Sequence, residues 1–269
     1  MDLTARFAEL MALPEDAIPL DEAAMILAAH ALPDLEVRRQ LDRLDRLAAD
    51  CPEATLEGLR RYLFADLGFV GDARRYHDPR NSYLPEVLDR RLGIPISLAV
   101  LAIEVGRRLG VALVGIGMPG HFLVRADGPA GSGIDPGPAG TAGFMDCFAG
   151  GRMLDTDGCA ALYGQTGQGP AFSAALLAPV GARVILGRML ANLQGIFLVT
   201  DLGAASWVVE LRQLIPGLGS AHRLDVAQAL GRLGRFTVAA AELELLADEY
   251  PATAATLTRQ ARALRARAN

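Results

Sequence analysis

Three side chains in the central part of the chain have the types and spacing that acyl-transfer chemistry uses. Ser97 stands near the start of residues 93–110, an apolar stretch typical of a helix, and His121 opens a strand-like run about two dozen residues later. A nucleophile at a helix N-terminus benefits from the helix dipole and from free backbone N–H groups. A histidine on a neighbouring strand can take the proton of that nucleophile, and a carboxylate can orient the histidine.

Two aspartates compete for the role of the carboxylate. Asp135 lies in the Gly- and Pro-rich segment "GIDPGPAG", which could be an inserted loop. Asp146 lies in "FMDCFAGGR", an apolar and strand-like context that would hold a side chain more firmly against a histidine. We favour Asp146 and keep Asp135 as the alternative.

Neighbouring polar residues admit both a structural and a functional role. Ser97 alone would be an ordinary first-turn residue of a helix. Asn81 could cap the following helix or donate a hydrogen bond to a developing oxyanion. Arg152 could pair with an acid near the site or lie in a solvated turn. His77, in "YHDPRN", is expected in a loop, and Cys147 should point away from Asp146 because neighbouring strand residues face opposite sides.

The hydrophobic pattern predicts a mostly helical α+β chain in three regions. Residues 1–75 show apolar residues at helical spacing and form a helical N-terminal segment. Residues 76–163 combine helices with short antiparallel strands, including two around the Gly-Pro turn of "VALVGIGMPGHFLVRA"; "FMDCF" is expected as another strand and "AGGRML" as a turn. A linker follows, and residues 180–269 are expected to form about five helices.

The C-terminal region contains one segment with the spacing of a tetratricopeptide unit. Residues 224–254, "LDVAQALGRLGRFTVAAAELELLADEYPATA", place a Leu-Gly-Arg-Phe turn between two helical halves and a proline after the second. A single unit of this kind cannot bury its faces alone and must pack on other helices. We expect a protein partner to bind through these helices.

The composition excludes several classes of function. All 26 basic residues are arginine, so a P-loop lysine, a pyridoxal phosphate Schiff base and a catalytic lysine are absent. A net charge of −5 argues against nucleic-acid binding. The three cysteines have no metal-binding spacing, and neither a metal nor a cofactor is expected. Charges interrupt the apolar runs and no export signal is visible, which predicts a cytoplasmic protein without a membrane span.

The stretches "NSYLPEVLDRRLGIPISLAVLAIEVGRRLG", "GMPGHFLVR" and "DCFAGGRML" resemble the signature segments of the transglutaminase-like branch of the SirB family of bacterial proteins. The resemblance covers roughly residues 15–255 and is strongest over residues 81–125. It implies a transglutaminase-like, papain-like core followed by tetratricopeptide-like helices. It also places the acid at Asp146 and leaves Asp135 in an inserted loop, although Cys147 replaces the proline usual in the family.

The resemblance implies two classes of function. Active transglutaminase-like enzymes have a cysteine at the helix-opening position, whereas this branch commonly has a serine, as at Ser97. A thiolate can form near neutral pH, but a serine needs a well-placed base for every turnover. We therefore expect a non-catalytic protein-binding or regulatory module. The alternative is a serine-dependent acyl-transfer enzyme or hydrolase that uses Ser97, His121 and Asp146.

Overall fold

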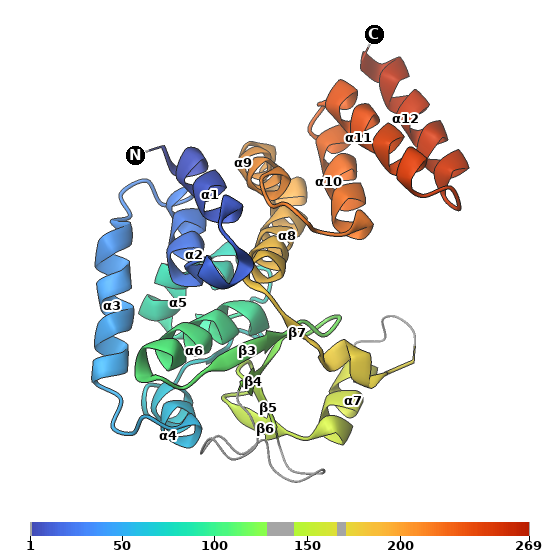
Figure 1. The fold of residues 1–269 in the computed structure, drawn as a ribbon. Coiled ribbons are helices and arrows are strands. Elements are labelled where there is room, and N and C mark those ends of the chain that lie inside the picture. The colour runs from blue at the N-terminus through green and yellow to red at the C-terminus, as the bar shows by residue number, and fades with distance from the viewer. Residues whose placement is uncertain (1, 128–142, 166–170, 269) are drawn as a thin grey trace. The chain divides into compact units, whose positions relative to one another are not determined.

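The computed structural model describes residues 2–127, 143–165 and 171–268 (Figure 1). Its packing divides the chain into two compact units. One consists of Pro14–Met189, and the other combines Met1–Leu13 with Leu190–Asn269. The sequence-based division at residues 75, 163 and 180 follows composition along the chain, whereas this grouping joins the first helix to the last ones.

The larger unit begins with helices that surround one buried helix. Helix α6 (Pro95–Leu109) starts with proline at its first position, where the fixed φ suits a helix, and ends at Gly110, whose φ is +76°. Eleven of its 15 residues are buried, as expected for a core helix. Its helical neighbours are α2 (Leu20–Ala29), α3 (Val37–Ala49), α4 (Leu56–Arg60) and α5 (Leu84–Arg90).

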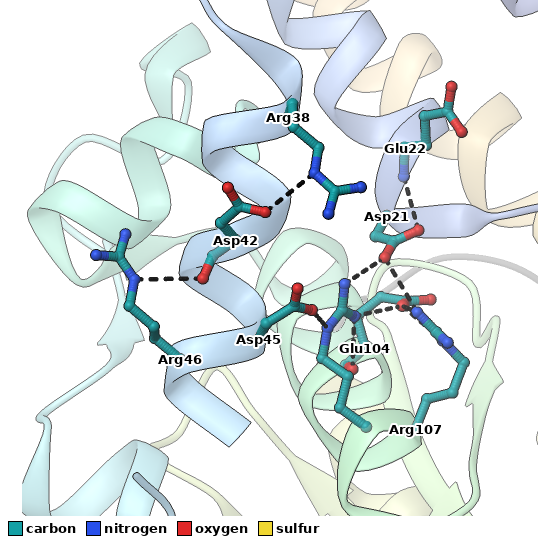
Figure 2. Close-up of polar contacts among 9 residues, drawn as sticks. Asp21, Glu22, Arg38, Asp42, Asp45, Arg46, Glu104 and Arg107 are labelled. Atoms are coloured by element: carbon teal, nitrogen blue, oxygen red, sulfur yellow. Dashed lines mark hydrogen bonds and ion pairs between the residues drawn. The ribbon is translucent and has the colours of Figure 1, made fainter. Parts of the chain in front are cut away.

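A network of charged side chains joins α2, α3 and α6 (Figure 2). Asp21 of α2 and Glu104 of α6 are buried, with exposed fractions of 5% and 3%. Arg108 donates to both carboxylates, at 2.6 and 3.0 Å, and to Asp45 of α3 at 2.7 Å. Arg107 reaches the same two buried carboxylates from the solvent side. The two arginines thus supply the positive charge that these buried acids need.

The sheet of the larger unit has five antiparallel strands in the order β6-β5-β4-β3-β7. The predicted pair of strands around the Gly-Pro turn is confirmed as β3 and β4, and the strand predicted in "FMDCF" is β5. Helix α6 packs on β3 and β4. The strands are β3 (Leu113–Ile116), β4 (Leu123–Ala126), β5 (Phe144–Asp146), β6 (Arg152–Leu154) and β7 (Pro179–Val180).

Two details of this region differ from the sequence prediction. "AGGRML" was expected to be only a turn, but Arg152–Leu154 forms β6, with Arg152 opposite Asp146. Gly150 and Gly151 have φ of +65° and +75°, which lets the chain reverse its direction within few residues after β5. Arg152 can then pair with β5 as the first residue of β6. Helix α7 (Thr156–Gln165) lies mostly before the expected linker, residues 164–179, and strand β7 begins at the last residue of that linker. Strand β7 is too short to show a periodic pattern.

A second, two-stranded sheet stands beside the start of α6. Strand β1 (Val70–Gly71) pairs in parallel with β2 (Leu92–Gly93). The backbone N–H of Gly71 also donates to the carbonyl of Phe148, 3.0 Å away. This short ladder therefore ties the chain before α6 to the turn that follows β5.

The smaller unit contains helix pairs, as the sequence predicted. Helix α11 (Phe236–Glu249) packs against both α10 (Ser220–Arg232) and α12 (Ala254–Ala268), and α9 (Leu202–Gln213) contacts α10 and α1 (Leu3–Ala12). Gly234, with φ of +78°, makes the turn between α10 and α11. Buried Ala227 and Ala240 allow close approach of these two helices. The five expected C-terminal helices are confirmed as α8 to α12.

Helix α8 (Ala182–Thr200) is, among the described residues, the one helix long and apolar enough to cross a membrane by length and composition. The sequence analysis expected a helix here but no membrane span, because charges such as Arg183 and Arg188 interrupt the apolar run. Its most apolar window has a mean hydropathy of 1.3, and 44% of that window is buried inside the protein. A core helix meets the same criterion, so this helix is weak evidence for a membrane span.

Candidate functional site

Ser97 is the third residue of α6, and its hydroxyl is engaged in local hydrogen bonds. Its Oγ accepts from the backbone N–H of Ile94, 3.1 Å away, which satisfies a donor at the helix N-terminus. The Oγ lies 2.6 Å from the carbonyl oxygen of Asn81 and 3.2 Å from that of Ile94. A hydroxyl has one proton, and the shorter contact makes Asn81 the better acceptor. The Ser97 side chain thus links α6 to the segment before α5.

The surroundings of Ser97 close it off from solvent. The exposed fraction of the residue is 0%. A Cβ added at Gly93 would lie 2.8 Å from Ser97 Oγ, so the missing side chain at position 93 leaves room for this hydroxyl. Within the described part of the chain, none of the hydrogen bonds of Ser97 goes to His121. The structure therefore does not join the predicted nucleophile to the predicted base.

Asn81 is fully buried, and its side-chain amide forms hydrogen bonds with residues on either side of it in the sequence. Its Nδ2 donates to the carbonyl of Arg75 at 2.7 Å, and its Oδ1 accepts from Arg90 at 3.0 Å. Arg90 also contacts Asp72, at 3.3 Å. These bonds hold the carbonyl of Asn81 against Ser97. They give Asn81 the position of a support for the start of α6.

The structure brings His121 and Asp146 together. Nε2 of His121, in the turn before β4, lies 2.9 Å from Oδ1 of Asp146, the last residue of β5. The same Oδ1 accepts from the backbone N–H of Ala149, and Oδ2 lies 3.2 Å from Arg152. Asp146 is buried, whereas Arg152 is more than half exposed. Asp135, the alternative acid, lies outside the described residues.

These contacts determine the charge of Asp146. Burial alone would favour the neutral acid, but the hydrogen bond with His121, the Ala149 N–H and the charge of Arg152 together outweigh it. The pKa of Asp146 is therefore below its ordinary value. The neighbouring Cys147 is fully buried, and burial raises the pKa of its thiol far above the ordinary range. A thiol kept neutral in this way is a poor nucleophile.

Two aromatic side chains that the sequence analysis missed, Phe148 and Tyr76, form a row beside the His121 ring. Phe148 meets His121 edge-on at a centroid distance of 6.1 Å, and Tyr76 meets Phe148 at 5.9 Å. His77, expected in a loop, is exposed and stacks edge-on against Tyr76. Phe148 could have been predicted near the site because it lies two residues after Asp146 in the sequence. For Tyr76 the sequence offered only its position next to His77.

Arg188 is a second residue that the sequence analysis missed. Its Nη2 donates to the carbonyls of Met118 and His121, at 3.1 and 3.0 Å, and its guanidinium lies over the ring of Phe122 at 5.2 Å. These contacts tie the start of α8 to the turn that carries His121. They join residues 67 positions apart, and no local pattern indicates such a contact.

The described residues hold no group of three or more His, Cys, Asp or Glu side chains that could bind a metal ion. The site consists instead of a histidine held by a carboxylate, two arginines and an aromatic row. Such a set can bind by charge, hydrogen bonds and stacking. It can also place a histidine for proton transfer, provided that a reacting group comes to Nδ1 of His121, which has no hydrogen-bond partner among the described residues.

The comparisons with known proteins identify the family of this chain. The sequence profile of the transglutaminase-like superfamily matches residues 31–191. A UPF0162 protein of Xylella fastidiosa is 36% identical over 260 residues, which cover 91% of this chain and 88% of that protein. A UPF0162 protein of Pseudomonas aeruginosa is 35% identical over 201 residues, covering 70% of this chain and 68% of the relative. The chain therefore belongs to the transglutaminase-like superfamily and, within it, to the family of UPF0162 proteins.

A more distant similarity covers only part of the chain. Human F-box only protein 21 is 34% identical over 139 residues, which cover 51% of this chain and 21% of that protein. No solved structure matches the chain. The predicted transglutaminase-like α+β core is confirmed by the profile match and by the antiparallel sheet.

Proposed function

We propose that the transglutaminase-like core of this chain is a non-catalytic binding module. The observation that carries the proposal is the state of Ser97, which is fully buried and hydrogen-bonded to Asn81 and Ile94. A nucleophile must be reachable by substrate and must lie within hydrogen-bond distance of its base. The hydroxyl of Ser97 serves instead as a cap that holds the start of α6.

The pair of His121 and Asp146 fits this role as part of a binding surface. Asp146 orients the imidazole through Nε2, and the aromatic row of Phe148 and Tyr76 offers contact area beside it. Tyrosine and histidine side chains combine an apolar body with a polar tip, which suits recognition of a partner. The alternative, a serine-dependent acyl transferase or hydrolase, draws its support from the same His121–Asp146 pair.

The C-terminal helices are the proposed site for a protein partner. An apolar groove of 600 Å³ lies between α10, α11 and α12, and Tyr250, which lines it, is 42% exposed. Grooves of this size and apolar character are common binding sites. A cytoplasmic location and membership of the SirB family's transglutaminase-like branch are part of the same proposal.

Labelling with a serine-reactive fluorophosphonate tests the absence of catalysis. The probe is applied to the wild type, to Ser97→Ala and to His121→Ala, with a serine hydrolase as positive control. The proposal predicts no labelling above background in any of the three proteins. Labelling of the wild type that disappears in both variants would show an activated serine and refute the proposal.

Partner capture tests the role of the helices. Proteins retained by the wild type are compared with those retained by Tyr250→Ser, in the groove, and by Val199→Ser, which changes a 73% exposed apolar residue elsewhere. We expect a partner that Tyr250→Ser loses and Val199→Ser keeps. Identical partners for all three proteins would contradict binding in this groove.

A further inference from the structure

Arg188 has a charge that no described carboxylate neutralises. The arginine is half-buried, and burial lowers the pKa of its guanidinium, but a guanidinium remains protonated in proteins. Its protein contacts are two backbone carbonyls and the ring of Phe122. By contrast, Arg183, one turn earlier on α8, pairs with Glu15 at 2.7 Å. A partly buried charge without a counter-ion among the described residues is available to a ligand of opposite charge.

The guanidinium has donors left for such a ligand. Of its five N–H groups, two on Nη2 are used by the carbonyls of Met118 and His121. The others, on Nη1 and Nε, have no acceptor among the described residues. Residue 117 beside Nη1 is a glycine, and a Cβ there would lie 3.0 Å from Nη1. The missing side chain at Gly117 leaves the approach to Nη1 less crowded.

The same arginine lies next to the residues of the candidate site. Its bond to the carbonyl of His121 places it on the turn whose imidazole is held by Asp146. Burial raises the pKa of the Tyr76 phenol, and the charge of Arg188 opposes that rise, so these two side chains lie within electrostatic range. A ligand on Arg188 would therefore lie close to the aromatic row.

We infer that Arg188 binds the carboxylate of a ligand beside His121. The inference deepens the proposed binding role of the core and rests on it. A singly charged, planar carboxylate matches one guanidinium whose fixed fork offers parallel N–H donors. A phosphate carries more charge and would need further cations. Of the two other nearby groups, Arg152 already serves Asp146, and Asp146 is itself negative.

The test is a titration of the full chain in which the NMR signals of the Gly117 and His121 backbone amides are monitored. The probes at constant ionic strength are N-acetylglycine, acetate, the neutral N-acetylglycinamide and inorganic phosphate. We expect saturation by both carboxylates with a Kd of about 1–10 mM, and no saturation by the amide. If N-acetylglycine binds more tightly than acetate, the carboxylate of the natural ligand is that of a peptide C-terminus. If the two bind equally, the site accepts any small carboxylate.

Two pairs of variants make the test specific. Arg188→Gln should weaken binding at least about tenfold, because it removes a charge-assisted hydrogen bond. Arg125→Gln, which removes an arginine stacked on Phe144, should leave it unchanged. Gly117→Ala should weaken binding while it keeps Arg188, whereas Gly164→Ala, whose new methyl group meets nothing within 4 Å, should not. The glycine pair decides the matter if Arg188→Gln fails to fold.

Several results would overturn the inference. One is the absence of a saturable change in the amide signals up to about 50 mM carboxylate. Another is that Arg188→Gln binds the carboxylates as tightly as the wild type. A third is that N-acetylglycine and N-acetylglycinamide change the signals equally. Phosphate binding ten times tighter than the carboxylates would overturn the assignment of the ligand class. The outcome is separable from that of the fluorophosphonate experiment, because carboxylate binding at Arg188 and labelling of Ser97 are measured independently.

Discussion

Nε2 of His121 and Oδ1 of Asp146 lie 2.9 Å apart, a hydrogen bond that joins the turn before β4 to the end of β5. This contact leaves Nδ1 as the other ring nitrogen of His121 for a ligand. The hydroxyl of Ser97, by contrast, donates to the carbonyl of Asn81 and accepts from the backbone N–H of Ile94. The core thus keeps the predicted base and its predicted orienting acid in contact, while the Ser97 hydroxyl is hydrogen-bonded at the start of α6.

Replacement of Asp146 by asparagine should destabilise the protein in a pH-dependent way. The pKa of Asp146 is lowered in the folded state, so its stabilisation is present above the ordinary carboxyl pKa and is lost as the pH falls through the folded value. We expect Asp146→Asn to cost about 2–3 kcal/mol at pH 7. The cost should shrink towards pH 3 in urea unfolding. Exposed Asp157→Asn is the control, and a loss that is independent of pH would contradict this view.

Gly71 should tolerate no side chain while Phe148 is present. A Cβ at position 71 would lie 2.2 Å from Cδ2 of the Phe148 ring. Gly71→Ala should therefore cost about 1–3 kcal/mol by overpacking, and Phe148→Leu should relieve part of that cost. A double-mutant cycle of unfolding free energies measures the coupling. Strictly additive effects would show that the two positions do not collide.

Arg108 and Arg107 form a matched pair for testing the network in Figure 2. The Arg108 side chain is 12% exposed and that of Arg107 is 59% exposed, although both reach Asp21 and Glu104. Arg108→Gln should cost about 3–5 kcal/mol because it leaves buried carboxylates without their main partner. Arg107→Gln should cost about 1 kcal/mol or less. Equal costs in urea unfolding would refute the importance of burial here.

His222 should make the stability of the helical unit depend on pH. Burial and the charge of Arg212 lower the pKa of His222, whose Nδ1 lies 3.1 Å from Nη2 of that arginine; Asp225 opposes the shift. A depressed histidine pKa means that the unfolded chain takes up the proton first. Stability should therefore fall as the pH drops below about 6.5. His222→Gln should flatten the dependence of Tm on pH, and exposed His77→Gln should not.

The sequence carried much of the fold because its signals were local. The Gly-Pro turn between two apolar runs predicted β3 and β4, and proline at the start with glycine at the end delimited α6. The pairing of Asp146 with His121 was also predicted, because an apolar, strand-like segment holds a carboxylate more firmly than the Gly- and Pro-rich segment around Asp135. Strand β6 was missed because only the φ values of Gly150 and Gly151 make the turn short enough.

The remainder of the site depends on contacts between distant segments. The carbonyl of Asn81 that receives the Ser97 hydroxyl comes from 16 residues away, and Arg188 reaches His121 across 67 residues. Backbone acceptors leave no trace in residue types, so neither contact was visible in the sequence. The grouping of α1 with the C-terminal helices likewise results from tertiary packing.

The most direct measurement is the reactivity of a thiol placed at position 97. Ser97→Cys is treated with iodoacetamide in the native state, and labelling of each cysteine is followed by peptide mass spectrometry. Half-exposed Cys51 and buried Cys147 provide internal standards for fast and slow reaction. If position 97 is a buried cap, its thiol should react as slowly as Cys147, at least about 100-fold more slowly than Cys51. Reaction as fast as that of Cys51 would contradict the account and point to an accessible nucleophile site.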